Sequence, residues 1–223
     1  LMPHAAAIQI DFDYTRDSTN FLAAGSSRRA TLEAAGAFFE NLLLDNLDAI
    51  SPGDSCGPGC SNTWTAQFTH PATGSPTGIT DLFIPADTLV VFVGARDLPE
   101  TMNSDPLAES GSGFTAFGTQ AWLDTVTQRG EGPTFGAKAV DTAPWGGVIA
   151  FDNTKNWHEE HFSDPSEGEN DLFSVALHEI GHLLGFGRLE VLQGQPSRWA
   201  NLISGTSFSG LASLGVFGGP VPL

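Results

Sequence analysis

The sequence predicts an α/β (α+β) fold, with helices packed on a mixed, twisted sheet, and three segments carry this prediction. In residues 8–14, apolar and acidic side chains alternate, as in a strand with one buried face. Residues 28–50 carry apolar side chains at helical spacing and are expected to form one long helix that ends before Pro52. Residues 88–94 form a continuous apolar run, which is typical of a central strand. A chain of 223 residues fits a single domain spanning residues 1–223.

Four further stretches give weaker predictions of secondary structure. Residues 64–69 are a second candidate strand, and residues 104–118, rich in Gly, Ser and Thr, are expected to be a loop. Residues 119–128 fit a helix or a strand, because their periodicity does not separate the two. Near the end of the chain, residues 208–216 are expected to form a short helix.

The stretch from Pro144 to Trp157 has the pattern of a short edge strand. Two glycines precede the apolar run 148–151, and a polar turn follows it. An edge strand beside a metal site can hold an extended peptide by backbone pairing. An ordinary edge strand without a ligand explains this stretch equally well.

The segment from Asp171 to Gly187, DLFSVALHEIGHLLGFG, contains the residues that are best suited to metal binding and catalysis. On a helix His178 and His182, at positions i and i+4, lie on the same face and can point their imidazoles at one metal ion. Glu179 is rotated off that row, so it can reach a water molecule as a general base without binding the metal.

The same segment has clear helix boundaries. Asn170 or Asp171 can cap the first turn, and Gly185 can end the helix in a left-handed conformation. A core-facing stripe is expected at Phe173, Leu177, Ile180 and Leu184.

Charge and cysteine content restrict the partners and the compartment. A net charge of −17 argues against nucleic acid and anionic membranes as partners. No apolar run is long enough to span a bilayer, and the start of the chain lacks a signal-peptide pattern, so a processed or truncated start is expected. Cys56 and Cys60 are expected to form a small disulfide, which indicates an oxidising, extracellular compartment; two free thiols in the cytosol are the alternative.

Residues 158–171, HEEHFSDPSEGEND, form a dense acidic stretch with two histidines. A solvated connection is the simpler interpretation. The alternative is a calcium site or a second zinc site. Its candidate ligands are His158, His161, Asp164, Glu167 and Glu169.

The segment VALHEIGHLLG, residues 175–185, resembles the catalytic helix of the metzincin zinc endopeptidases, with its HExxHxxG motif. The preceding GGVIAFDNTKNW is similar to the edge strand of the matrixin branch. The wider pattern, from IQIDFDY through SVALHEIGH to FGGPVPL, resembles secreted bacterial metzincin-like proteins.

This resemblance implies a metzincin-like fold and a zinc endopeptidase that hydrolyses peptide or protein substrates with a metal-activated water. It implies that His178 and His182 bind zinc, that Glu179 is the catalytic base, and that the protein is secreted. It also implies a third zinc ligand six residues after the second histidine, where this chain has Arg188, and a guanidinium cannot bind a metal. The family's methionine turn is also missing, because no methionine follows the helix.

Three explanations of the missing ligand are considered. In the first, the catalytic domain is truncated at its C-terminus, and the third ligand is a histidine farther along the chain, as in the leishmanolysin-like arrangement. In the second, Glu190, the only carboxylate after His182, completes the site, or His158, His161 or another chain does. In the third, the fold persists without activity, as a catalytically silent secreted scaffold or a self-assembling protein. A calcium-dependent binding module is a further alternative, favoured only by the acidic residues.

Overall fold

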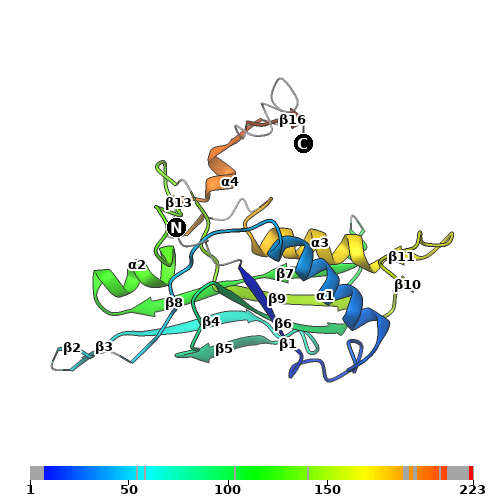
Figure 1. The fold of residues 1–223 in the computed structure, drawn as a ribbon, viewed down its shortest axis with the longest axis horizontal. Helices are drawn as coiled ribbons and strands as arrows, with labels where there is room; N and C mark the ends of the chain where they lie inside the picture. The colour runs from blue at the N-terminus through cyan, green and yellow to red at the C-terminus, as the bar shows by residue number, and fades with distance from the viewer. Residues whose placement is uncertain are drawn as a thin grey trace, which may run out of the picture.

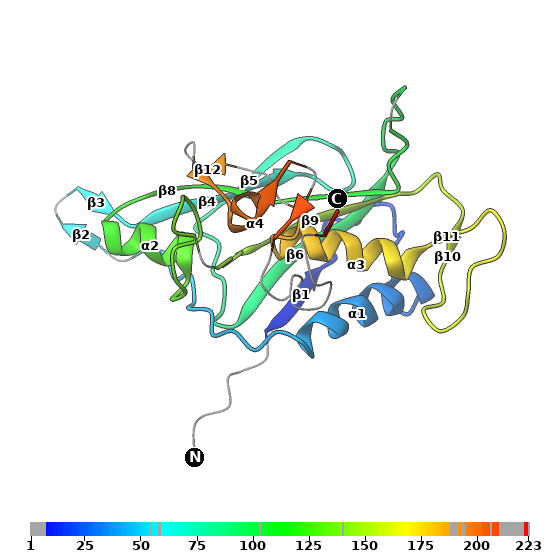
Figure 2. The same cartoon turned by 90° about the horizontal axis from the view of Figure 1, so that it is seen from above.

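The computed structural model of the chain describes residues 8–53, 55–57, 59–102, 104–139, 141–187, 191–192, 195–205, 207–209 and 221–222. Figure 1 shows a twisted sheet with two helices lying across one face, α1 (Ser27–Glu40) and α3 (Leu172–Leu183). Seen from above in Figure 2, these two helices run side by side. The predicted α/β class is confirmed.

The main sheet has the strand order β1-β6-β9-β7. Strands β1 (Gln9–Asp13), β6 (Thr88–Arg96) and β9 (Gly146–Asp152) are parallel, and β7 (Ala108–Gly111) is antiparallel to β9 at one edge. The predicted first strand and the predicted central strand are therefore confirmed. The latter, β6, is hydrogen-bonded on both sides, and nearly all its side chains are buried.

The predicted edge strand at residues 148–151 is wrong, because β9 lies inside the sheet between β6 and β7. All seven residues of β9 are buried, so its apolar run is explained by packing against both faces of the strand. The outer strand on this side of the sheet is β7, in the stretch 104–118 that was expected to be a loop, and β1 is the outer strand on the other side. That expectation is wrong as well.

A second sheet has the strand order β5-β4-β8, with β5 (Pro76–Thr80), β4 (Thr63–Thr69) and β8 (Gly113–Phe117), and it confirms the candidate strand at residues 64–69. Ser112 links β7 to β8, so a single stretch of chain forms an edge in both sheets. Residues 119–128, which fitted either a helix or a strand, form helix α2 (Gln120–Gln128).

Two apolar cores lie on opposite faces of the main sheet. The first packs the sheet against α1 and α3 and includes Leu32, Phe151 and Ile180. The second packs it against the smaller sheet and α2 and is rich in aromatic rings. Its rings are Trp64, Phe68, Phe92, Trp122 and Trp145.

Helix α1 is shorter than the sequence predicts. It ends at Glu40, where the backbone N–H and the side-chain amide of Asn41 both donate to the carbonyl of Ala37. The following apolar residues bind elsewhere: Leu47 N–H donates to Asp87 Oδ1 (2.8 Å), and Ile50 pairs with Ile84. The apolar residues after Glu40 therefore have helical spacing in the sequence, but they belong to a non-helical segment that is held by contacts with distant residues.

Short elements complete the described chain. Residue 208, at the start of the predicted helix 208–216, lies in a strand, and 210–216 lie outside the described residues. No helix among the described residues is long and apolar enough to cross a membrane. The short elements are β2 (Ser55–Gly57), β3 (Cys60–Ser61), β10 (Trp157–His158), β11 (Asn170–Asp171), β12 (Val191–Leu192), β13 (Gln195–Pro196), α4 (Arg198–Asn201), β14 (Ile203–Ser204), β15 (Ser207–Phe208) and β16 (Val221–Pro222).

A buried arginine connects the segments at which two strands of the main sheet, β6 and β9, begin. Arg129 follows α2 in a left-handed conformation and is completely buried. Its guanidinium donates to four carbonyl oxygens at 2.8–2.9 Å, those of Asp48, Pro85, Thr88 and Pro144. Burial lowers the pKa of Arg129 to about 10, which still leaves the guanidinium charged at neutral pH. Because Thr88 begins β6 and Pro144 leads into β9, this cation holds the starts of both strands together.

Candidate metal centre

Helix α3 is held at its start and along its buried face. The Asp171 carboxylate accepts hydrogen bonds from the N–H groups of Phe173 and Ser174, both at 3.3 Å, which resolves the two candidate caps in favour of Asp171. Four side chains face the first core and fix the rotation of the helix about its axis, namely Leu172, Ala176, Ile180 and Leu183. The histidine row is thereby turned away from the core.

His178 and His182 lie together on that row, as their spacing predicts. Their Nε2 atoms are 2.9 Å apart, and the two rings meet edge to face at 85° with centroids 4.4 Å apart. His178 is exposed and His182 is half-buried, so both imidazoles can be reached from outside. Two ring nitrogens that converge in this way suit a shared cation, which takes a lone pair from each.

The tautomer of His182 is set by the turn after the helix. Its Nδ1 lies 2.7 Å from the carbonyl oxygen of Phe186. A carbonyl oxygen can only accept, so Nδ1 carries the proton and Nε2 keeps the lone pair that a metal needs. This hydrogen bond orients the ring as well as fixing its protonation.

Two glycines make that turn possible. Gly185 and Gly187 have φ values of 99° and 73°, in the left-handed region that favours glycine. A Cβ at Gly187 would lie 2.9 Å from His182 Cε1 and 3.1 Å from its Nδ1. The sequence indicated Gly185 as the end of the helix, but it gave no role to Gly187 or to the Phe186 carbonyl.

Glu179 is buried, with a relative exposure of 6%, although its neighbour in sequence is an exposed histidine. Within the described part of the chain, its carboxylate makes no hydrogen bond or ion pair. Among the described residues, the fully enclosed side-chain atoms that lack a partner do not include its oxygens, so these oxygens face accessible space. The position fits a base that works on a substrate or on water, because no group in the described part of the chain occupies its oxygens.

The two histidines of the acidic stretch lie elsewhere. His158 Nε2 is 2.9 Å from the carbonyl oxygen of Ser163, and its Nδ1 is 3.5 Å from a Glu169 oxygen. His161 Nδ1 lies 3.5 Å from Thr31 Oγ1. His158 belongs to β10, which lies beside the start of α3 (Figure 2), and the ring of His161 lies 5.9 Å from that of Phe173 in the first turn of α3, whereas His182 is in its last turn. They are therefore not brought to the histidine pair.

No other ligand joins the pair in the described part of the chain, where no group of three His, Cys, Asp or Glu side chains could hold a metal. Arg188 and Glu190, which bear on the third ligand, lie outside the described residues. The completion of the site therefore stays a prediction.

The structure describes the side chain of one of the two cysteines of the predicted disulfide. Cys60 is disulfide-bonded, and the described residues include no free cysteine. The side chain of Cys56 is outside those described, so the pairing of Cys56 with Cys60 stays a prediction.

Comparison with protein families gives a match to one part of the chain. Residues 115–192 match the matrixin family. The resemblance to metzincin-type zinc metallopeptidases is thereby confirmed. The matched matrixin segment runs from β8 to β12 and includes His178, Glu179 and His182. It supports zinc as the metal and peptides or proteins as the substrates. No curated protein and no solved structure matches the chain.

Proposed function

We propose that this chain is a zinc-dependent endopeptidase in which His178 and His182 hold the zinc ion and Glu179 is the general base. The observation that carries the proposal is the convergence of the two Nε2 atoms at 2.9 Å within a matrixin-like segment, next to a mostly buried glutamate that has no partner among the described residues. The His182 tautomer fixed by the Phe186 carbonyl supports it independently.

The chain's own residues supply positioning and proton transfer. When bound, zinc polarises the peptide carbonyl and makes water a better nucleophile near neutral pH. Glu179 accepts a proton from the attacking water and then delivers it to the leaving amine. The side chain of Glu179 is mostly buried, which restricts its movement, while its oxygens stay open to a water molecule or a substrate.

The substrate is proposed to lie along β7, in place of the strand at residues 148–151 expected from the sequence. Strand β7 is the outermost strand of the main sheet, so its outer edge is available for backbone pairing. Helix α3 packs directly against β7 and β9, which brings the histidine row close to that edge. An extended peptide paired with β7 would therefore pass beside the metal.

Further parts of the proposal concern the ligand set and the surroundings. Glu190, or a ligand outside this sequence, is proposed to complete the zinc site, since a catalytic zinc normally has three protein ligands. Secretion is supported by the disulfide at Cys60. A calcium ion at residues 158–171 is supported only by the carboxylates there.

The test is hydrolysis of casein and of a quenched fluorescent peptide library by the zinc-loaded chain and its Glu179→Gln variant. Glutamine keeps the size of the side chain but cannot accept the proton. We expect cleavage by the unaltered chain and a loss of roughly 10²- to 10⁴-fold in the variant, the usual contribution of a general base. Equal hydrolysis by both proteins would refute the role of Glu179. Absence of hydrolysis with one zinc bound per chain would favour the silent scaffold instead.

A further inference from the structure

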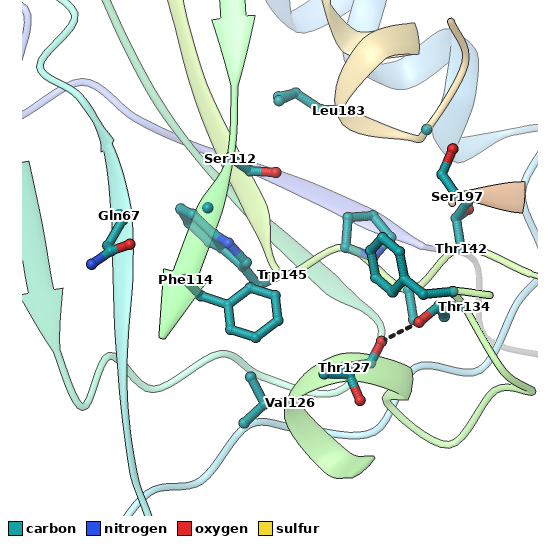
Figure 3. Close-up of a pocket in the computed structure, with 15 residues that line it drawn as sticks. Gln67, Ser112, Phe114, Val126, Thr127, Thr134, Thr142, Trp145, Leu183 and Ser197 are labelled. Atoms are coloured by element: carbon teal, nitrogen blue, oxygen red, sulfur yellow. Dashed lines mark hydrogen bonds between the residues drawn. The ribbon is translucent and has the colours of Figure 1, made fainter. Parts of the chain in front are cut away.

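An apolar cavity of about 250 Å³ lies next to the C-terminal end of α3. Figure 3 shows its walls, which come from elements far apart in sequence: Phe114 at the start of β8, Val126 on α2, Trp145 before β9 and Leu183 on α3. Phe135, Ala143 and Pro144 also contribute apolar groups to its lining. The proposed mechanism uses none of these residues.

The lining determines what chemistry the cavity can accept. Among the described residues that border it, none is charged. Two of its hydroxyl groups are already engaged: Thr134 Oγ1 donates to the Thr127 carbonyl (2.9 Å, dashed in Figure 3), and Thr142 Oγ1 donates to the Leu184 carbonyl (3.1 Å). An uncharged and mainly apolar occupant fits this lining, in which the indole Nε1 of Trp145 is a buried donor without a hydrogen-bond partner among the described residues.

The volume restricts the occupant further. Pockets for drug-sized ligands measure about 300–1,000 Å³, so this cavity is smaller than most of them. It suits one large side chain, and aromatic side chains bury the most apolar area of any.

The cavity begins where the open edge strand ends. A Cβ at Gly147 would lie 2.6 Å from Leu183 Cδ2, 2.6 Å from the Gly111 carbonyl oxygen and 3.1 Å from Ser112 Cβ. The end of α3 that carries His182 and Leu183 therefore lies over the Ser112 end of β7. Because Ser112 and Leu183 also line the cavity, a peptide that leaves the metal along β7 in this direction arrives at its walls.

We propose that this cavity binds a large apolar side chain, preferably aromatic, of the peptide substrate, on the N-terminal side of the scissile bond. The inference rests on the proposed endopeptidase function. Antiparallel pairing, the more stable mode, makes the substrate run from the Ser112 end of β7 towards Ala108. Residues that precede the scissile bond then lie at the Ser112 end, beside the cavity.

The first experiment maps cleavage positions in a random peptide library by mass spectrometry, using the zinc-loaded chain. We expect Phe, Tyr, Trp or Leu to be enriched at one position before the scissile bond. Replacing that residue by Ala in a single cleaved peptide should lower kcat/KM by about ten- to a hundredfold, the effect of losing one buried large apolar side chain. Enrichment only after the scissile bond, or no enrichment, overturns the proposal.

Two cavity variants and a matched control make the test specific. Ala143→Phe places a ring in the cavity and should abolish the preference, whereas Phe114→Ala widens the cavity and should shift the preference towards Trp. Ala30→Phe, on the exposed part of α1, makes the same chemical change elsewhere and should leave the preference intact. A preference that persists unchanged in both cavity variants contradicts the assignment, even where cleavage itself is normal.

A binding measurement separates this proposal from the endopeptidase assignment. N-acetyl-phenylalaninamide is titrated into the chain and followed by NMR, with N-acetyl-alaninamide as the control compound. We expect shifts of the Val126 and Leu183 methyl signals with the phenylalanine compound only, and no shifts in Ala143→Phe. Normal cleavage without these shifts overturns the cavity proposal alone. If the methyl signals shift but the zinc-loaded chain cleaves no peptide, both the substrate-binding role of the cavity and the endopeptidase assignment are overturned.

Discussion

His182 donates its Nδ1 proton to the carbonyl oxygen of Phe186 across 2.7 Å, and this contact controls which ring nitrogen faces His178. The donor and acceptor are four residues apart, on either side of the end of α3. The ligand geometry therefore depends on the turn after the helix as much as on the helix itself. Substitutions in the turn should change metal binding without touching a ligand.

Gly187→Ala should weaken zinc binding by roughly 10- to 100-fold, the range for losing a partner that orients a metal-binding histidine. The added Cβ would lie 2.9 Å from His182 Cε1, so the ring or the turn must move. The measurement is competitive zinc titration against a chromophoric chelator. Gly25→Ala is the matched control, because Gly25 also has a positive φ (79°) but its added Cβ meets nothing within 4 Å. Equal zinc affinity in the two variants would contradict the positioning role of the turn.

Glu179→Gln should preserve or raise thermal stability while it removes turnover. The carboxylate of this mostly buried side chain lacks a partner in the described part of the chain, so a neutral amide of similar size breaks no contact there and removes a charge that nothing balances. We expect the free energy of unfolding of the metal-free chain to rise by up to about 1 kcal/mol. Urea denaturation measures the change. A loss of more than about 1 kcal/mol would show that the carboxylate has a structural partner.

Arg129→Met should destabilise the chain by about 3 kcal/mol or more, because four carbonyl oxygens lose a charged donor that is itself completely buried. Arg129→Lys keeps the charge but offers fewer donors in a different geometry, so its loss should be intermediate. Equilibrium denaturation of both variants checks the order. Stability equal to that of the unaltered chain in Arg129→Met would contradict the proposed role in joining the starts of β6 and β9.

N-methylation of substrate backbone amides should reveal pairing with β7 as a period-two pattern. Alternate residues of a paired strand direct their N–H groups to the neighbouring strand. In a series of peptides methylated at one amide each, kcat/KM should fall about tenfold at every second position, since each lost pair is one hydrogen bond with an unsatisfied partner. The intervening positions are the internal control. A uniform effect along the peptide would argue against strand pairing.

The sequence predicts α3 and its histidine row well because both depend on local features. Helical spacing brings His178 and His182 together, and Asp171 caps the helix within its own segment. Strand β6 was equally readable, since its apolar run is long and continuous. In these elements the local preference and the tertiary environment agree.

The failures occur where tertiary partners decide. Strand β7 has Gly and Ser in place of typical strand residues and is held by pairing with β9, so composition alone indicated a loop. The helix pattern beyond Glu40 is overridden by the partners of Leu47 and Ile50. The edge assignment of β9 failed because a short apolar run does not reveal how many strands flank it. Its lack of polar residues between Gly146 and Phe151 was the available signal for an interior strand.

The central claim is that His178 and His182 hold one zinc ion through their Nε2 atoms, and zinc K-edge X-ray absorption of the zinc-loaded chain tests it most directly. The account predicts one zinc per chain with two imidazole nitrogens at about 2.0–2.1 Å and oxygen ligands completing the shell. The imidazole contribution should fall by half in His178→Ala and in His182→Ala and stay unchanged in His161→Ala. Zinc that does not bind, or an imidazole contribution that is the same in all three variants, would contradict the account.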